Sequence, residues 1–309
     1  MRRLIVLGAV LAAFIVAWGV QRWQQGRLVA SAPAKTLSVH PDRVTGLRIT
    51  KPGSPVVAIE RVAGAWRIQS PGEYRANEQV VTGVIETLDS LALVDVVSTN
   101  PAKRGTFQVD STGTRVQVLE GDKTVLDVIV GKSSPDFSHT YLRPEGGDEV
   151  YRADGMLTYN FNKRVDDWRD KTILDIDPAG IVRLTLEYPK EKTQVVLAKR
   201  DATTWTVAAA GGTPEVGDSL AVAAVLRSSA KLSTVNFATP EETATVSFAA
   251  PDFRLQIDTD AGSHTITFVE GESGKMYAQR SGEPTLFQLY KNSLANLMKK
   301  AEDLRPKKT

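Results

Sequence analysis

The chain of 309 residues contains no cysteine and only three histidines. Without cysteine it can form no disulfide, and it cannot carry a lipid on an N-terminal cysteine. The histidines are His40, His139 and His264, and no pair of them has the spacing of metal ligands. We therefore expect each histidine to be a surface or turn residue, and we expect the body to be stabilised by its own core.

A large excess of charge of one sign is also missing. The 38 Lys and Arg residues nearly balance the 36 Asp and Glu residues, which leaves a net charge of +2. This balance gives no broad electrostatic footprint for nucleic acid, so nucleic acid is not predicted as a partner. The one basic cluster that we find is the tail Lys299–Lys308, which we expect to be a solvated helix end with its cations placed against the helix dipole.

An uncharged apolar run is present at the N-terminus, from Leu4 to Val20 behind two arginines. Extended to Trp23, the run is 20 residues long, and at 1.5 Å per residue a helix of that length spans roughly 30 Å, the hydrocarbon thickness of a bilayer. We predict a transmembrane anchor over Leu4–Trp23. A cleaved signal peptide stays open as the alternative, because Ala30–Ala32 fits a small-x-small cleavage site.

The orientation of this anchor follows from the short tail before it. Such a tail normally stays in the cytoplasm, and long following domains cross the membrane largely regardless of charge. We therefore predict a single-pass protein of the bacterial cytoplasmic membrane with its N-terminus inside and its body in the periplasm or outside. The predicted organisation is a cytoplasmic stub and anchor over 1–23, a linker over 24–37, a first α+β repeat over 38–176, and a second α+β repeat with a basic tail over 177–309.

The two halves of the body resemble each other. Trp66 and Trp205 are separated by 139 positions (205 − 66) and lie in similar surroundings. Two further pairs of segments recur at separations of 139 and 136: Arg115–Val118 with Arg254–Ile257, and Thr140–Arg143 with Met276–Gln279. Two copies are too few for a solenoid, so the repeat predicts two related lobes.

Within each half, alternation of apolar and polar residues predicts strands with one buried face. The first half has such strands around Leu47–Ile49, at Arg115–Leu119 and at Val125–Val130. A 3.6-residue apolar stripe from Val80 to Leu91 predicts a helix, and its counterpart is a stripe from Val222 to Leu232. Strands outnumber helices and most turns are short, so we predict an α+β fold with mainly antiparallel sheets and packed amphipathic helices.

Each half is predicted to close with one more helix. We expect the first of these over Met156–Arg164 and the second over Tyr290–Asp303. A hairpin from Thr140 to Arg152, which turns at Glu145–Asp148, is expected to precede the closing helix of the first half.

The order of several weak motifs resembles a known family. These motifs are Pro41–Ile49, Gly64–Pro71, Tyr141-x-Arg143, Val150-Tyr151 and Trp168–Asp170. Their order is similar to the bacterial domain of unknown function 4340, in two tandem copies over most of residues 38–305. The family commonly has Tyr-Gly-Leu before the third group of strands, where this chain has Arg104–Phe107. The resemblance implies an accessory role in the cell envelope, because members are often encoded near subunits of ABC-type transporters of the gliding-motility type.

The tetrapeptide Gly217–Leu220 has the nucleophile sequence of GDSL esterases. That chemistry requires Ser219 after a buried strand, with a histidine and an aspartate held beside it. The block Asp136-x-x-His139 could supply both partners, but it precedes the serine instead of following it. By the repeat, the tetrapeptide falls at the start of a helix, so we predict that Asp218 or Ser219 caps that helix.

Three other patterns favour structural roles. Gly131–Ser133 resembles the end of a phosphate loop, but Leu126 replaces the first glycine of that motif, so we predict a loop between strands. Asp166, Asp167 and Asp170 alternate with arginines and are predicted to form structural ion pairs. Trp66 and Trp205 are predicted to pack in the cores, with ligand stacking as the alternative.

We predict no catalytic, cofactor-binding or metal-binding residues, and no cofactor. The preferred hypothesis is a non-catalytic accessory or scaffold protein that is anchored in the membrane and partners the permease subunits of an ABC-type transporter. The alternative is a periplasmic module that binds envelope glycan or lipid between the two lobes. A GDSL-like hydrolase that uses Ser219 is a third hypothesis.

Overall fold

The computed structural model describes residue 16 and residues 35–306. The anchor predicted over Leu4–Trp23 falls outside the described residues except for Val16. Among the residues described, no helix combines the length and the apolar character needed to cross a bilayer.

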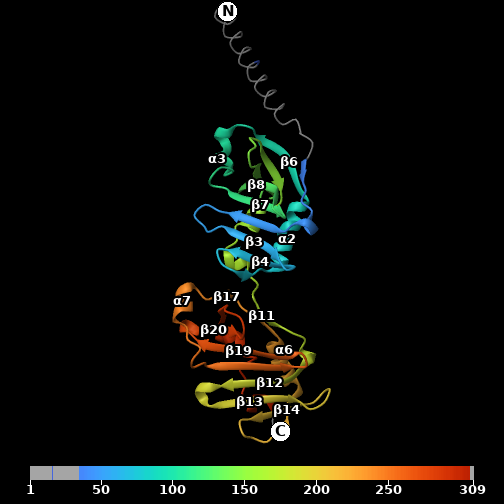
Figure 1. The fold of residues 1–309 in the computed structure, drawn as a ribbon, viewed down its shortest axis with the longest axis vertical. Coiled ribbons are helices and arrows are strands. Elements are labelled where there is room, and N and C mark those ends of the chain that lie inside the picture. Colours follow the sequence, from blue (N-terminus) through green and yellow to red (C-terminus); the bar gives the residue numbers. More distant parts are fainter. Residues whose placement is uncertain (1–15, 17–34, 307–309) are drawn as a thin grey trace, which may run out of the picture. The chain divides into compact units, whose positions relative to one another are not determined.

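The chain divides into two compact units, Met1–Asp170 and Lys171–Thr309. Each unit is built on one large sheet with a few short helices (Figure 1). All strand pairs in the described residues are antiparallel. The predicted predominance of antiparallel sheet is therefore confirmed.

The first unit contains a ten-stranded sheet in the order β1-β6-β10-β9-β8-β7-β2-β3-β4-β5. Its strands are β1 (Lys35–Leu37), β2 (Gly46–Thr50), β3 (Val57–Val62), β4 (Ala65–Ser70), β5 (Tyr74–Arg75), β6 (Leu91–Ser98), β7 (Thr114–Glu120), β8 (Lys123–Ser133), β9 (His139–Pro144) and β10 (Val150–Asp154). Its helices are η1 (Pro41–Arg43), α2 (Glu78–Asp89), η2 (Pro101–Lys103), α3 (Arg104–Phe107), α4 (Leu157–Phe161) and α5 (Val165–Trp168).

The second unit contains a nine-stranded sheet in the order β15-β14-β13-β12-β18-β19-β20-β21-β17, and a separate pair β11-β16. Its strands are β11 (Thr172–Asp175), β12 (Ile181–Tyr188), β13 (Thr193–Lys199), β14 (Trp205–Ala209), β15 (Glu215–Val216), β16 (Lys231–Ser233), β17 (Asn236–Phe237), β18 (Phe253–Thr259), β19 (Gly262–Glu270), β20 (Lys275–Arg280) and β21 (Phe287–Tyr290). Its helices are η3 (Pro178–Gly180), η4 (Pro189–Glu191), α6 (Ser219–Ala230), α7 (Pro240–Thr245), η5 (Glu272–Gly274), η6 (Lys291–Leu294) and η7 (Ala301–Leu304).

The two units share one strand order. From the β5 edge the first sheet runs through β4, β3, β2, β7, β8, β9, β10 and β6, and from the β15 edge the second runs through β14, β13, β12, β18, β19, β20, β21 and β17. In the first unit a single strand, β6, follows α2. In the second unit two short strands follow α6 instead: β16, which pairs with β11, and β17, which pairs with β21. The cross-strand registers agree as well, with Leu47 opposite Ile59 and Val118 in the first unit, and Leu184 opposite Leu197 and Ile257 in the second.

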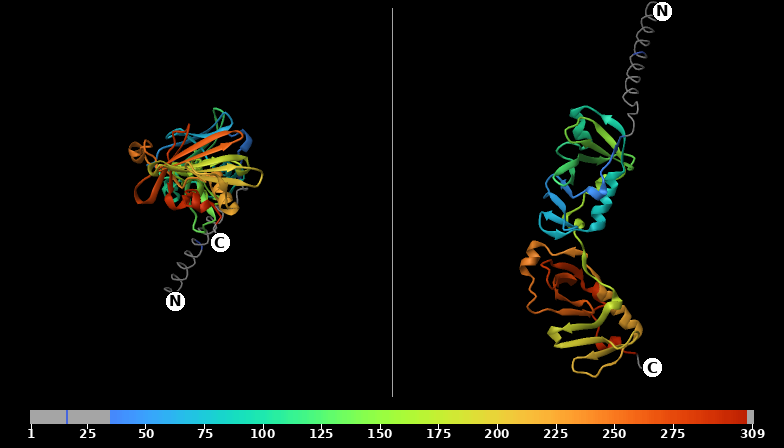
Figure 2. Two further views of the ribbon diagram at one scale, coloured as in Figure 1. Left: turned by 90° about the horizontal axis from the view of Figure 1, so that it is seen from below. Right: turned by 45° about the vertical axis from the view of Figure 1, so that its right-hand side comes forward.

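Each unit buries one face of its sheet against a twelve-residue helix, α2 or α6. In the right-hand view of Figure 2 each helix lies beside the strands of its own unit. The carboxamide of Asn77 accepts a hydrogen bond from the backbone N–H of Val80 at 3.1 Å, which caps the first turn of α2. The inward residues of α2 recur in α6 141 positions later, as Val81 with Val222, Val84 with Val225, and Ile85 with Leu226.

The helix ends differ from the sequence prediction. Leu91 and Leu232 do not continue the helical stripes, because α2 ends at Asp89 and α6 ends at Ala230, and both leucines lie on the following strands. Their side chains are still buried, so the apolar periodicity alone could not show the change from helix to strand.

The predicted closing helices are also broken. The segment predicted as one helix over Met156–Arg164 forms only α4, and α5 follows it as a separate turn. Tyr290–Asp303 forms the two short 3₁₀ helices η6 and η7, so the prediction of one long helix was wrong. The end of the predicted basic tail, residues 307–308, lies outside the described residues. The hydroxyl of Ser293 donates to the backbone carbonyl of Tyr290 at 2.6 Å, a local bond of the kind that competes with regular helix.

Equivalent core positions should contribute similarly in the two units. Ile59 and Leu197 are both fully buried, and each lies opposite an inward residue of β2 or β12. We predict that Ile59→Ala and Leu197→Ala each lower the free energy of unfolding by about 2–5 kcal/mol. The control Val62→Ala, at an exposed position of β3, should change it by about 0.5 kcal/mol or less. Urea denaturation measures both, and a core variant that unfolds like the control would contradict the assignment of the buried face.

Candidate functional site

The outward face of the first sheet carries a row of side chains that crosses four strands. Thr50 on β2 lies opposite Arg115 on β7, Arg115 lies opposite Ile129 on β8, and Ile129 lies opposite Arg143 on β9. These four residues point away from the core because they alternate with inward residues such as Ile49. The row therefore forms a floor on which polar groups from distant parts of the chain are brought together.

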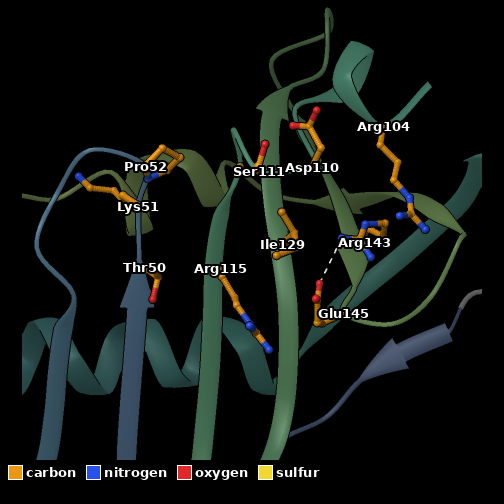
Figure 3. A pocket seen from close by; sticks show the side chains of 11 residues that line it. Thr50, Lys51, Pro52, Arg104, Asp110, Ser111, Arg115, Ile129, Arg143 and Glu145 are labelled. Carbon is orange, nitrogen blue, oxygen red and sulfur yellow. Dashed lines mark hydrogen bonds and ion pairs between the residues drawn. The ribbon is translucent and has the colours of Figure 1, made fainter. Parts of the chain in front are cut away.

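The row is the floor of an open hollow of about 420 Å³, here called the Arg143 hollow (Figure 3). The remaining lining residues come from the β2–β3 loop, from α3 and the segment that follows it, and from the end of β9. The hollow is lined by Thr50, Lys51, Pro52, Arg104, Asp110, Ser111, Gly113, Arg115, Ile129, Arg143 and Glu145.

Arg143 is the most deeply held charged group of the hollow, with only 6% of its surface exposed. Its Nε donates to the carbonyl of Val109 at 2.9 Å, and its Nη1 donates to the carbonyl of Gly147 at 3.0 Å. Its Nη2 donates to the Glu145 carboxylate at 3.1 Å. This bonding satisfies the desolvated guanidinium and fixes its plane at the wall of the hollow.

A second guanidinium converges on the same carbonyl. Arg104 donates through Nη2 to the carbonyl of Gly147 at 3.1 Å and to the Asp148 carboxylate at 2.5 Å. Its Nε is buried and has no hydrogen-bond partner in the described part of the chain. Figure 3 shows the heads of Arg104 and Arg143 side by side. The two guanidiniums share this acceptor, and each also pairs with a carboxylate, Asp148 or Glu145.

The other ionisable groups are held by local bonds. Arg115 forms a bidentate pair with Asp127, with N···O distances of 2.8 and 2.7 Å, and its bond to this carboxylate raises the pKa of the guanidinium. Hydrogen bonds from the side chain and backbone of Thr112 lower the pKa of Asp110. On the opposite side, Lys51 donates to the carbonyl of Lys163 at 3.0 Å.

The roof of the hollow depends on two glycines. A Cβ on Gly131 would lie 2.2 Å from the carbonyl oxygen of Phe107, and a Cβ on Gly113 would lie 2.4 Å from that of Gln108. Both positions therefore need glycine for the backbone of the 104–113 segment to reach the end of β8. The ring of Phe107 then packs on Tyr141 at 4.7 Å between centroids, which fixes this segment over the outward face.

The equivalent row of the second unit has different chemistry. It consists of Glu187 on β12, Arg254 on β18, Thr267 on β19 and Gln279 on β20. Glu187 and Arg254 lie opposite each other and form an ion pair at 2.7 Å. In the first unit Thr50 takes the place of that acid, so its row contains two cations and no carboxylate.

A separate polar cluster lies at the N-terminal part of α7 in the second unit. One oxygen of Glu242 accepts hydrogen bonds from Lys275 Nζ and from the Tyr277 hydroxyl, both at 2.6 Å. The bonds from Lys275 and Tyr277 lower the pKa of Glu242 to about 2. Burial, followed by the bond to this carboxylate, raises the pKa of Tyr277 to about 12.

The structure assigns the GDSL tetrapeptide to a helix start. Asp218 is the N-cap of α6, and its carboxylate accepts from the backbone N–H of Leu220 at 3.0 Å and of Ala221 at 2.8 Å. The predicted cap is confirmed for Asp218. Asp136 and His139 belong to the other unit, where they bond to each other at 2.9 Å.

Of the sequence predictions for the other patterns, some are confirmed and some are wrong. Gly131–Ser133 is not a loop but the end of β8, where the pairing with β9 shifts register. Two ion pairs form within the predicted set, Arg169 with Asp166 at 3.1 Å and Arg164 with Asp167 at 3.8 Å. Asp170 pairs instead with Arg75 at 3.6 Å, and it lies beyond the end of α5 at Trp168. Within the described residues no group of three or more His, Asp or Glu side chains could hold a metal ion.

The two tryptophans differ in burial. Trp66 is buried in the first core, with the guanidinium of Arg61 5.4 Å from its ring centroid. Trp205 is half-buried and lines a hollow of about 250 Å³ that also includes Ser219 and Val222. Core packing is thus confirmed for Trp66, and Trp205 packs only partly against its core.

Comparison with known families gives one match. Residues 66–251, more than half of the chain, match the domain of unknown function DUF4340. The chain belongs to the DUF4340 family. The single DUF4340 match runs from Trp66 in β4 to Pro251 just before β18, so it crosses the boundary between the units. It includes Arg104, Arg115 and Arg143 of the hollow. Neither a curated protein nor a solved structure matches the chain.

The capping role of Asp218 can be tested against its neighbour. Asp218→Ala should lower the free energy of unfolding by about 1 kcal/mol, because two N–H groups of α6 lose their acceptor. Ser219→Ala should change it by about 0.5 kcal/mol or less, since Ser219 provides no cap. Urea denaturation of the two variants measures the difference, and equal losses would contradict the assignment of the cap to Asp218.

The lowered pKa of Glu242 predicts a loss of stability in acid. The folded pKa of about 2 lies below the ordinary value of 4.5, so the carboxylate stabilises the fold above about pH 4.5, and this contribution is lost as the pH falls from 4.5 toward 2. Glu242→Gln should therefore be less stable than the native chain at about pH 6 and nearly as stable at about pH 2. Denaturation midpoints across this range measure the gap, with Glu60→Gln at an exposed position of β3 as the control. A gap that stays constant with pH would refute the assignment.

Proposed function

We propose that this DUF4340 protein is a non-catalytic accessory or scaffold protein, anchored in the bacterial cytoplasmic membrane by Leu4–Trp23, with its body in the periplasm or outside. The observation that carries the proposal is the outward face of each sheet, where charged groups are held in fixed pairs on a rigid floor. Such an arrangement is suited to recognising a partner or ligand, because its donors and acceptors are oriented before anything binds.

We propose that its partners are the permease subunits of an ABC-type transporter of the gliding-motility type. Family membership supports this proposal by association, since members are often encoded near such subunits. The anchor would hold the body close to those subunits, and a tethered partner needs only a modest contact area because its effective concentration is high.

We also propose that the two units arose by duplication of one ancestral lobe. The shared strand order, the matching cross-strand registers and the equivalent helices α2 and α6 support this origin. On this view the family match covers the end of one copy and the beginning of the next, and the outward rows at Arg115 and Arg254 are descendants of a single row that have since diverged.

A second candidate function is the binding of an envelope ligand, and the Arg143 hollow favours it. The hollow has the size of a small-molecule site and combines charged groups with one apolar residue of the floor, Ile129. It lies within the first unit, and both functions could operate in one protein, since a scaffold can also bind a small ligand.

The accessory role predicts a stable complex in detergent. The full chain, extracted from membranes in a mild detergent, should co-purify with the transporter permease subunits, and a variant that lacks residues 1–23 should be recovered in the soluble fraction with much less of them. A reporter fused after Thr309 should be active only outside the cytoplasm. Repeated recovery of the full chain alone, or a reporter that faces the cytoplasm, would count against the proposal.

A further inference from the structure

The Arg143 hollow carries more positive than negative charge in its lining. Lys51, Arg104, Arg115 and Arg143 line it together with two acids, Asp110 and Glu145. Two acids outside the lining, Asp127 and Asp148, pair with Arg115 and Arg104, so the four cations are matched by four acids in all. Arg104 still has an unused donor, because its buried Nε has no hydrogen-bond partner in the described part of the chain.

The two sides of the hollow offer different groups. Figure 3 shows Arg104 and Arg143 on one side and Lys51 with Pro52 on the other, with Ile129 between them. Arg104 and Arg143 share the carbonyl of Gly147 as acceptor, and each also pairs with one carboxylate, Asp148 or Glu145. An oxyanion placed beside them would accept charge-assisted hydrogen bonds from their remaining N–H groups.

The acids of the lining indicate what else the ligand must carry. Asp110 and Glu145 are already engaged, by Thr112 and by Arg143, so they are poor partners for a full ammonium charge. Each carboxylate still has lone pairs that can accept from a neutral hydroxyl. The hydroxyls of Thr50 and Ser111 add further hydrogen-bonding groups to the same lining.

We infer that the Arg143 hollow binds an acidic saccharide unit, a sugar that carries a carboxylate or a phosphate. The acidic group faces Arg104 and Arg143, the hydroxyls bond Lys51, Asp110, Glu145 and the serine and threonine of the lining, and the carbon skeleton lies over Ile129. A hollow of about 420 Å³ accommodates one such sugar. This inference rests on the second proposed function, ligand binding, and does not require a transporter partner.

The comparison between units supplies a matched control. Arg254 occupies the same register position as Arg115, but the row of the second unit has Gln279 where the first unit has Arg143. An acidic sugar should therefore bind the first unit and not the equivalent row of the second. Arg254→Gln removes a guanidinium of the same kind, on an equivalent strand, without touching the Arg143 hollow.

The test is a titration of the full chain in mild detergent, followed by calorimetry and by ligand-observed NMR. The probes are galacturonate, its short oligomers, glucose 6-phosphate, uncharged glucose, inorganic phosphate and alanine. Galacturonate or glucose 6-phosphate should bind with a Kd on the order of 1 mM or tighter, more weakly as salt is raised, while glucose should not bind at this level. Tighter binding of the oligomers than of galacturonate would assign the site to a glycan chain, and equal binding would assign it to a free sugar acid.

The variants locate the site. Arg104→Gln and Lys51→Gln should each weaken binding by about tenfold, the loss expected for one charge-assisted hydrogen bond. Arg254→Gln should leave binding unchanged. Lys51 lies at the open rim, so its variant keeps the test valid even if Arg104→Gln fails to fold.

Four results would overturn the inference. These are no binding of either acidic sugar up to about 50 times the expected Kd of 1 mM, equal binding of inorganic phosphate, tighter binding of alanine, and a loss in Arg254→Gln as large as that in Arg104→Gln. None of them bears on co-purification with the permease subunits, so failure of the ligand inference and failure of the accessory role are separate outcomes.

Discussion

Burial of one face of an antiparallel sheet against a twelve-residue helix is the interaction on which each unit depends. Because neighbouring side chains of a strand point to opposite faces, the apolar set that packs on α2 or α6 also decides which residues point outward. Ile49 and Val116 lie opposite each other and face the first core. Thr50 follows Ile49 and Arg115 precedes Val116, so these two residues lie side by side on the opposite face of the sheet. A slip of one residue would exchange the two sets, so the core fixes the composition of the outward row.

Much of this fold can be predicted from the sequence, because its signals are local. The strands predicted at Arg115–Leu119 and Val125–Val130 form and pair as β7 and β8, and the hairpin predicted over Thr140–Arg152 forms from β9 and β10. The paired segments at Thr140 and Met276 occupy equivalent places on β9 and β20, as their similarity indicates. What failed were the helix ends. Leu91 is the first residue of β6 and is buried like the inward residues of α2, so the apolar periodicity does not show where the helix ends and the strand begins.

The candidate site could not be predicted in the same way. Thr50, Arg115, Ile129 and Arg143 are far apart in the sequence and become neighbours only through the strand order β2-β7-β8-β9. No single one of them belongs to a motif with a known chemistry. The one local signal is an arginine, Arg143, directly after buried Leu142 in a strand, and its burial is evident only once the 104–113 segment is seen to cover it.

The outward rows at Arg115 and Arg254 differ in chemistry although the two units share one strand order. Glu187 lies opposite Arg254 and neutralises it within the row, whereas Thr50 at the equivalent place leaves Arg115 to pair with Asp127 on the next strand. Both arrangements satisfy the arginine, and neither disturbs the core, because the exchange occurs on the outward face. Substitutions there are less restricted by core packing. Membership of the DUF4340 family therefore says more about the sheet and its register in a relative than about the outward row, which follows from the relative's own residues.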